Sequence, residues 1–200
     1  MTTTYDWPTA FGVNRFELRI SHNTKAFISP FTSSSQVMNY TGERFIASIG
    51  MVPGNSVIRG ASVEAFLDRM SGPANRVRLW NMRRPQPVGT LSGSPTNIST
   101  IAVGARSAFI QTSAGLTLLA GDHIGIANGQ NVRIMADAVA NGSGVMAIEF
   151  QPRARTEVAI GGAITWNRPT FDAMLKTDGA PITWRPGMYE ETSLEFIEAI

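Results

Sequence analysis

Along the first eighty residues, hydrophobic and polar positions follow the pattern of β-strands. Apolar and charged residues alternate strictly over 16–20, as they do in a strand with one buried face. Two more strands are predicted over 36–40 and 44–49, with a turn at 41–43 between them. Residues 75–80 alternate again, which places Val77 and Leu79 on one face and Arg76, Arg78 and Trp80 on the other.

One helix is predicted, from about Ala61 to Met70. Its apolar residues are spaced at i, i+3, i+4 and i+7, which makes one continuous stripe of Val63, Phe66, Leu67 and Met70. Gly72 and Pro73 follow directly, and this pair is a stop signal for a helix.

The composition changes after residue 85, where glycine, proline and serine become frequent up to residue 95. Short strands are then predicted over 107–113 and 145–150. Asn128-Gly129 between two β runs, 123–127 and 131–135, is a strong signal for a hairpin. We therefore interpret 87–153 as a small inserted β-barrel or β-meander module.

Three further strands, over 163–166, 182–184 and 192–198, are expected to complete the sheet that the first segment began. In the last of them, Leu194 and Phe196 share one face, and Glu198 falls on the same side. The predicted fold is therefore mainly β. A β-sandwich-like belt domain with one short helix, made of 1–86 and 154–200, carries the inserted module.

Few enzyme classes fit this composition. Among 200 residues there is no cysteine and there are two histidines, which removes thiol nucleophiles, disulfides and clustered metal ligands. Asp122-His123 is a suggestive pair, but a turn aspartate that caps local amides explains it better. No nucleophile elbow or phosphate-binding loop occurs. The sequence predicts no enzyme, no metal and no cofactor.

No stretch approaches the roughly 18 consecutive apolar residues of a transmembrane helix, and residues 1–8 lack the features of a secretory signal, so no membrane partner is expected.

The charges are unevenly placed along the chain. The net charge is only +2, and fifteen of the seventeen cationic residues are arginine. No acidic residue occurs between Asp68 and Asp122, where six arginines fall. The last eleven residues carry four glutamates and no cation. Arginine is frequent in protein interfaces, whereas nucleic-acid grooves usually mix it with lysine, so we expect protein contacts and no specific nucleic-acid binding.

Several segments resemble the distal tail proteins of long-tailed bacteriophages and gene transfer agents. The resemblance begins with Phe16–Ile20 (FELRI), followed by 23–30 (NTKAFISP) and by GERF at 42–45. The closest match is the helix 61–70 leading into GPANRVRLW at 72–80. The run LAGDHI at 119–124, with AIEFQPR at 147–153, is similar to an inserted β module of phage tail components.

This resemblance implies a virion structural protein without catalytic residues. Such proteins form a ring, usually hexameric, at the distal end of the tail, and they join the tail tube to the hub and to receptor-binding or fibre proteins. It implies a location at the tail tip of the virion, after assembly in the host cytoplasm. Two alternatives stay open. One is another phage connector, such as a tail-completion or head–tail joining protein. The other is a carbohydrate-binding module, in which Trp80 or Trp166 stacks on sugar rings.

A ring needs two different, complementary faces on each subunit. The acid-free segment and the glutamate-rich end of the chain offer such a pair, although both segments can also pair inside one subunit. The hypothesis is that cations of one subunit meet carboxylates of the next, the cations being Arg76, Arg78, Arg83 and Arg84 and the carboxylates Glu190, Glu191, Glu195 and Glu198.

Overall fold

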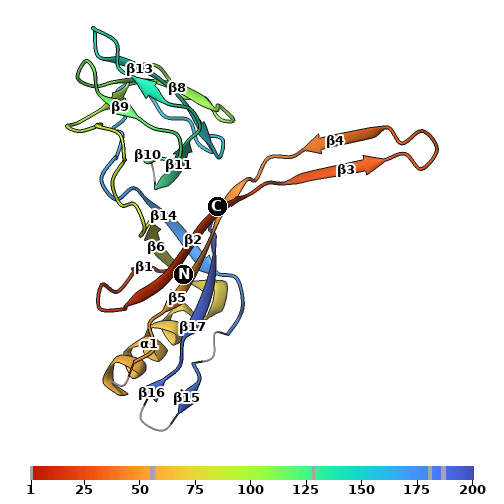
Figure 1. Cartoon of the computed structure of the whole chain (residues 1–200), viewed down its shortest axis with the longest axis vertical. Coiled ribbons are helices and arrows are strands. Elements are labelled where there is room, and N and C mark those ends of the chain that lie inside the picture. The colour runs from red at the N-terminus through yellow and green to blue at the C-terminus, as the bar shows by residue number, and fades with distance from the viewer. Residues whose placement is uncertain (1, 55–56, 128, 180–181, 186–187) are drawn as a thin grey trace.

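The computed structural model describes residues 2–54, 57–127, 129–179, 182–185 and 188–200. Figure 1 shows three parts: a lower domain built on a six-stranded sheet, an upper β module, and a two-stranded hairpin that extends sideways from between them. We call these the belt domain, the module and the arm, and the arm is residues 24–39.

The belt domain is a single sheet with the strand order β1-β6-β14-β17-β5-β2. β1 pairs in parallel with β6, and the other neighbours are antiparallel. Strands from before and after the module therefore lie side by side in one sheet. Its strands are β1 (Thr4–Asp6), β2 (Val13–Ser21), β5 (Arg44–Met51), β6 (Arg76–Trp80), β14 (Thr170–Leu175) and β17 (Thr192–Glu198).

One face of this sheet is covered by α1 (Val57–Met70), which is followed by a 3₁₀ turn, η1 (Gly72–Ala74). The predicted apolar stripe of α1 is buried against alternate residues of the sheet, which include Phe45, Ala47, Ile49, Val77, Leu79, Phe171, Leu194 and Phe196. The mainly β fold with one helix is confirmed. The second layer of the belt domain is the helix α1. A β-sandwich would have a second sheet in this place.

The helix begins at Val57, before the predicted start at Ala61. The sequence pattern did not predict the first turn of this helix, because it contains Gly60 and glycine lowers helix propensity. The ring of Trp184 lies where a side chain at this position would point, so glycine lets the two approach closely. Trp184 belongs to a short hairpin beside the helix, formed by β15 (Trp184–Arg185) and β16 (Met188–Tyr189).

The module has a five-stranded sheet, β10-β11-β13-β8-β7, and a two-stranded sheet of β9 and β12. Its buried core draws residues from Leu91 to Ile164, so it extends beyond the expected boundary at 153 because Ala154, Val158 and Ile164 complete it. The strands are β7 (Thr96–Asn97), β8 (Ser107–Gln111), β9 (Thr117–Leu118), β10 (His123–Ala127), β11 (Gln130–Ile134), β12 (Ala138–Val139) and β13 (Val145–Gln151).

Most predicted strands of the second half are present, and two differ. Of the strand predicted over 182–184, only Trp184 lies in a strand, and that strand, β15, pairs with β16 in a separate two-stranded sheet and not with the belt sheet. β10 and β11 pair as the predicted hairpin, whose residue Asn128 lies outside the described residues. Residues 163–166 do not form a separate strand; they make isolated bridges to Thr96 and Gly125 and belong to the module. The belt strand next to β6 is instead β14.

The turn before β13 shows which glycine the fold requires. Gly144 has φ +77°, and a Cβ there would collide with the backbone oxygen of Thr112. Gly142, in the same turn, has open space around it. We expect Gly144→Ala to lower the free energy of unfolding by about 2 kcal/mol or more, through backbone strain and the clash.

Gly142→Ala is the matched control, with an expected change within about 0.5 kcal/mol. Urea unfolding of both variants measures the difference, and equal stabilities would contradict this account of the turn.

Candidate functional site

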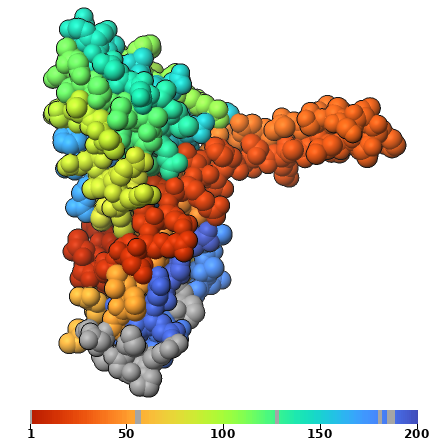
Figure 2. All heavy atoms as spheres, viewed as in Figure 1, coloured from red at the N-terminus to blue at the C-terminus, as the bar shows by residue number. Residues whose placement is uncertain are grey.

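The arm exposes apolar side chains along its length. It consists of β3 (Thr24–Ile28) and β4 (Ser35–Asn39), whose residues are all exposed. Figure 2 shows it standing clear of the body of the molecule. Lys25 is its one charged residue. Its large apolar side chains and their exposed fractions are Phe27 65%, Ile28 65%, Phe31 94%, Val37 66% and Met38 62%.

Both faces of the arm are apolar. Directly opposite residues of an antiparallel pair project to the same side, and successive pairs alternate. Ala26 is opposite Val37 on one face, and Lys25 is opposite Met38 on the other, which also carries Phe27. Among the residues that the structure describes, each strand of the arm pairs only with the other, so both outer edges have unpaired backbone groups. A two-stranded ribbon of this kind is marginally stable alone and a template for pairing with another chain.

The arm continues the β2–β5 pair of the belt domain after a break in register. The last belt pair is Ser21 with Arg44, and the first arm pair is Thr24 with Asn39. Two residues separate these pairs on one strand and four on the other, a bulge that includes Gly42 at φ +104°. Bulges bend a ribbon and increase its twist. Beyond this bulge the arm extends sideways from the rest of the molecule (Figure 1).

A buried network of charges holds the base of the arm. Glu43 is 3% exposed and accepts a hydrogen bond of 2.7 Å from Arg106 Nη2 of the module. Its backbone oxygen accepts a bond of 3.0 Å from Arg155 Nη2. Arg155 also donates two bonds, of 2.5 and 2.6 Å, to the carboxylate of Glu198. Glu198, 1% exposed, further accepts the N–H of Phe45. Arm base, module and belt domain are thus joined by charge-assisted hydrogen bonds.

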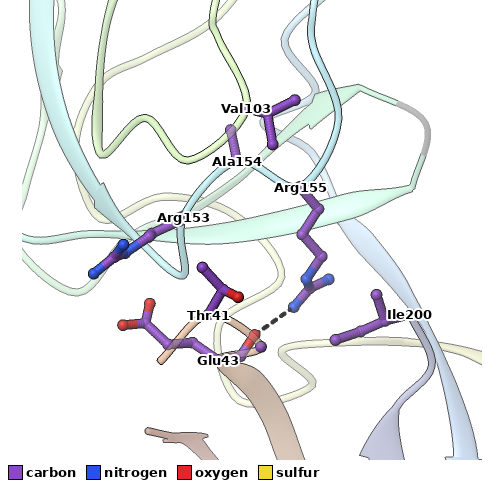
Figure 3. A pocket seen from close by; sticks show the side chains of 8 residues that line it. Thr41, Glu43, Val103, Arg153, Ala154, Arg155 and Ile200 are labelled. Atoms are coloured by element: carbon purple, nitrogen blue, oxygen red, sulfur yellow. Dashed lines mark hydrogen bonds between the residues drawn. The ribbon is translucent and has the colours of Figure 1, made fainter. Parts of the chain in front are cut away.

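A pocket of about 330 Å³ opens beside this network (Figure 3). Among the described residues, Glu43 Oε2 and the Nε atoms of Arg153 and Arg155 are buried there without a hydrogen-bond partner. Its lining is Thr41, Gly42, Glu43, Val103, Arg153, Ala154, Arg155 and Ile200.

A second cluster at the same junction surrounds His123, which is 4% exposed. Arg133 Nε donates to His123 Nε2 at 3.3 Å, so this nitrogen carries no proton, and Nδ1–H donates to Asn131 Oδ1 at 3.1 Å. Arg133 also donates to the backbone oxygen of Leu18 in the belt domain. Burial, and then the charges of Arg133 and Arg84, lower the pKa of His123 to about 4.

The open face of the belt sheet carries ion pairs within the subunit. Arg78 lies 3.4 Å from Asp6 and 3.9 Å from Asp172 on the neighbouring strands. Glu195 lies 2.9 Å from Lys176 and 3.3 Å from Arg19, and the hydrogen bond from Lys176 lowers its pKa. These two predicted interface residues therefore already have partners in their own subunit.

The structure corrects the prediction for Glu198. It is buried and bound to Arg155, so it is not accessible to a neighbouring subunit. Arg76 and Glu198 line a common pocket of about 200 Å³ inside one subunit. Glu191 accepts a hydrogen bond of 2.8 Å from Asn14 Nδ2, and Glu190 lies next to it before β17. Pairing of the remaining residues between subunits stays a prediction.

Trp80 and Trp166, the residues that would stack on sugars in the carbohydrate-binding alternative, contact other residues of their own chain. The guanidinium of Arg168 lies over the Trp80 ring at 4.1 Å from its centroid. The indole N–H of Trp166 donates to the backbone oxygen of Gly93 at 2.8 Å, and the ring packs on the core of the module. The arrangement therefore does not favour a carbohydrate site at either residue.

The sequence pattern alone did not single out the arm or the residues at its base. One signal was present: between Glu17 and Glu43 there is no acidic residue, although this segment contains alternating apolar residues. Glu43, Arg106 and Arg155 are far apart along the chain, so no local pattern brings them together.

The sequence matches no protein-family model and no curated protein. In the part of the chain that the structure describes, no helix has the length and apolarity needed to cross a membrane. Within that same part, no three histidine or carboxylate side chains are grouped so that they would hold a metal ion.

Proposed function

We propose that this protein is a structural subunit of a virion, which forms a ring at the distal end of a phage tail and joins the tail tube to the hub and the receptor-binding proteins. The arm is the observation that carries this proposal. The resemblance of residues 16–45 and 61–80 to distal tail proteins supports the choice of assembly and a ring of six.

An arm of this composition fits an assembly subunit, because its exposed side chains are those that proteins usually bury. Covering a side chain of this size yields roughly 1.5–3 kcal/mol. Five of them therefore yield on the order of 10 kcal/mol, which is comparable to the 4–15 kcal/mol that association costs. In the proposed ring, the arm of one copy contacts a different surface of the next copy. Such a head-to-tail contact closes into a ring when the rotation allows.

The experiment compares the full chain with a variant in which Asn-Gly replaces the arm. The backbone of Tyr40 already donates to Asn23 at 2.8 Å, so a two-residue turn can close the shortened hairpin. We expect native mass spectrometry and negative-stain images to show a closed ring for the full chain and a folded monomer for the variant. A ring from the variant, or a full chain that is monomeric at every concentration, would overturn the proposal.

Point variants separate the arm from general surface hydrophobicity. Phe27→Ser with Met38→Ser removes two exposed apolar side chains from one face of the arm. Val139→Ser with Ile160→Ser removes two from the module, where they are 63% and 68% exposed. We expect only the first pair to prevent the ring.

A further inference from the structure

Three arginines surround a pocket beside the edge strand β2, at the junction of belt domain and module. The pocket has a volume of about 270 Å³. β2 contributes Phe16, Glu17 and Leu18 to it, the turn after β6 contributes Asn81, Arg83 and Arg84, and β11 contributes Arg133. It shares Phe16, Glu17 and Arg83 with a neighbouring pocket along the same strand.

The turn that presents two of these arginines is a built feature. Asn81 is 6% exposed, and its Oδ1 accepts the backbone N–H groups of Arg83 and Arg84, each at 3.2 Å. The backbone N–H of Arg84 also donates to the backbone oxygen of Asn81 at 3.1 Å. This side-chain-capped turn fixes the backbone from which both guanidinium groups extend.

No carboxylate among the described residues that line this pocket is paired with any of these three arginines. The side chains of Arg84 and Arg133 donate hydrogen bonds to neutral acceptors, which are the backbone oxygens of Gly121 and Leu18 and the ring nitrogen Nε2 of His123. Within the described residues Arg83 has no side-chain hydrogen bond or ion pair. The one carboxylate in the lining, Glu17, is bound to Arg15 Nε and Nη2 at 2.9 and 2.6 Å.

Five arginines elsewhere in the chain differ from these three, because each of them forms an ion pair with a carboxylate. Carboxylate partners are present for Arg15, Arg19, Arg78, Arg106 and Arg155. At the pocket, burial lowers the pKa of Arg133, and the positive charge of Arg84 lowers it further, because like charges held close together disfavour each other. An anion between the guanidinium groups removes this repulsion.

We propose that Arg83, Arg84 and Arg133 form a binding site for a small oxyanion of the phosphate or carboxylate class. Planar guanidinium groups bind two oxygens of such an anion at once, with hydrogen bonds that are strengthened by the charges on both sides. Arg83 is free to turn toward the ligand, and Arg133 is held in place by its bonds to Leu18 and His123. The site does not depend on the ring, and a monomer contains all of it.

The test is a titration of the full chain with inorganic phosphate and a separate titration with acetate. Sodium chloride keeps the ionic strength constant in both. Binding is followed by calorimetry and by the Nε–Hε signals of the arginines in NMR spectra. We expect phosphate to move the signals of Arg83, Arg84 and Arg133 and to bind about tenfold more weakly to Arg83→Gln, the loss of one charge-assisted contact. Stronger binding of phosphate identifies a phosphate site, and stronger binding of acetate identifies a carboxylate site.

Arg69→Gln is the matched control, because it removes the same charge from an exposed position at the end of α1. It is expected to bind as the unchanged chain does. Equal affinity of the Arg83→Gln variant, or no response of the unchanged chain to either anion beyond that to chloride, would overturn the proposal. Thermal unfolding of each variant verifies that it is folded.

Discussion

Replacing Glu198 by alanine is expected to lower the free energy of unfolding by about 3–5 kcal/mol, the usual cost of removing one partner of a buried ion pair. Its carboxylate accepts two hydrogen bonds from Arg155 and one from the backbone of Phe45. The variant leaves a guanidinium without its counter-ion, in a side chain that is only 19% exposed. It also leaves a buried N–H without an acceptor. Urea unfolding followed by tryptophan fluorescence measures the loss.

Glu195→Ala is the matched control on the same strand. Glu195 has two cationic partners, Lys176 and Arg19, where Glu198 has one among the described residues, but the side chain of Glu195 is 36% exposed. Exposed ion pairs contribute little, so the expected loss is below about 1 kcal/mol. Comparable losses of stability in the two variants would show that burial does not distinguish these carboxylates. They would contradict the claim that the buried pair of Glu198 and Arg155 stabilises the junction of belt domain and module.

Alternation along the chain was a reliable guide to the strands and their faces. It placed Val77 and Leu79 of β6 inside and Arg78 outside, as observed. It also put Glu198 on the same face as Leu194 and Phe196, and all three are buried. The pattern gives the side to which a residue points. It does not give the partner that a buried charge needs, because Arg155 comes from a different part of the chain.

The arm shows a second limit of sequence patterns. The strand predicted over 36–40 exists as β4, but it pairs with β3 and lies outside the domain that its apolar residues suggest. Apolar alternation indicates burial in the final state of the protein. Where that state is an assembly, the pattern marks surfaces that one subunit leaves exposed.

The boundary of the module was missed for a different reason. The stretch from 151 to 155 contains a proline and two arginines and is typical of a linker, but Ala154 lies in the core of the module, and Arg155 binds Glu198. This stretch, where the chain returns from the module, therefore connects the module to the belt domain through side-chain contacts. Arg155 also binds the backbone oxygen of Glu43, so the same arginine connects the returning chain to the base of the arm.

Lowering the pH from 7 to 4 is expected to cost up to about 3 kcal/mol of stability through His123 alone. Its pKa is 6.5 in an unfolded chain and about 4 in the fold. Between these values the unfolded chain binds a proton that the folded chain excludes, so stability falls as the pH falls through this range. The loss is nearly complete at pH 4, and it levels off below that pH as the folded chain also takes up the proton. Each unit of difference in pKa corresponds to about 1.4 kcal/mol.

The surroundings of His123 explain why the folded state excludes this proton. A proton on Nε2 would remove the bond from Arg133, and it would place a second positive charge beside that guanidinium and near Arg84. The hydrogen bond to Asn131 and the carboxylate of Asp122 act in the opposite direction but do not offset the burial. Because other carboxylates titrate in the same range, the measurement is the difference in unfolding free energy between the unchanged chain and His123→Gln at several pH values. We expect this difference to change by up to about 3 kcal/mol between pH 7 and pH 4. A difference that is constant with pH would mean that His123 takes up its proton in the folded chain as readily as in the unfolded one.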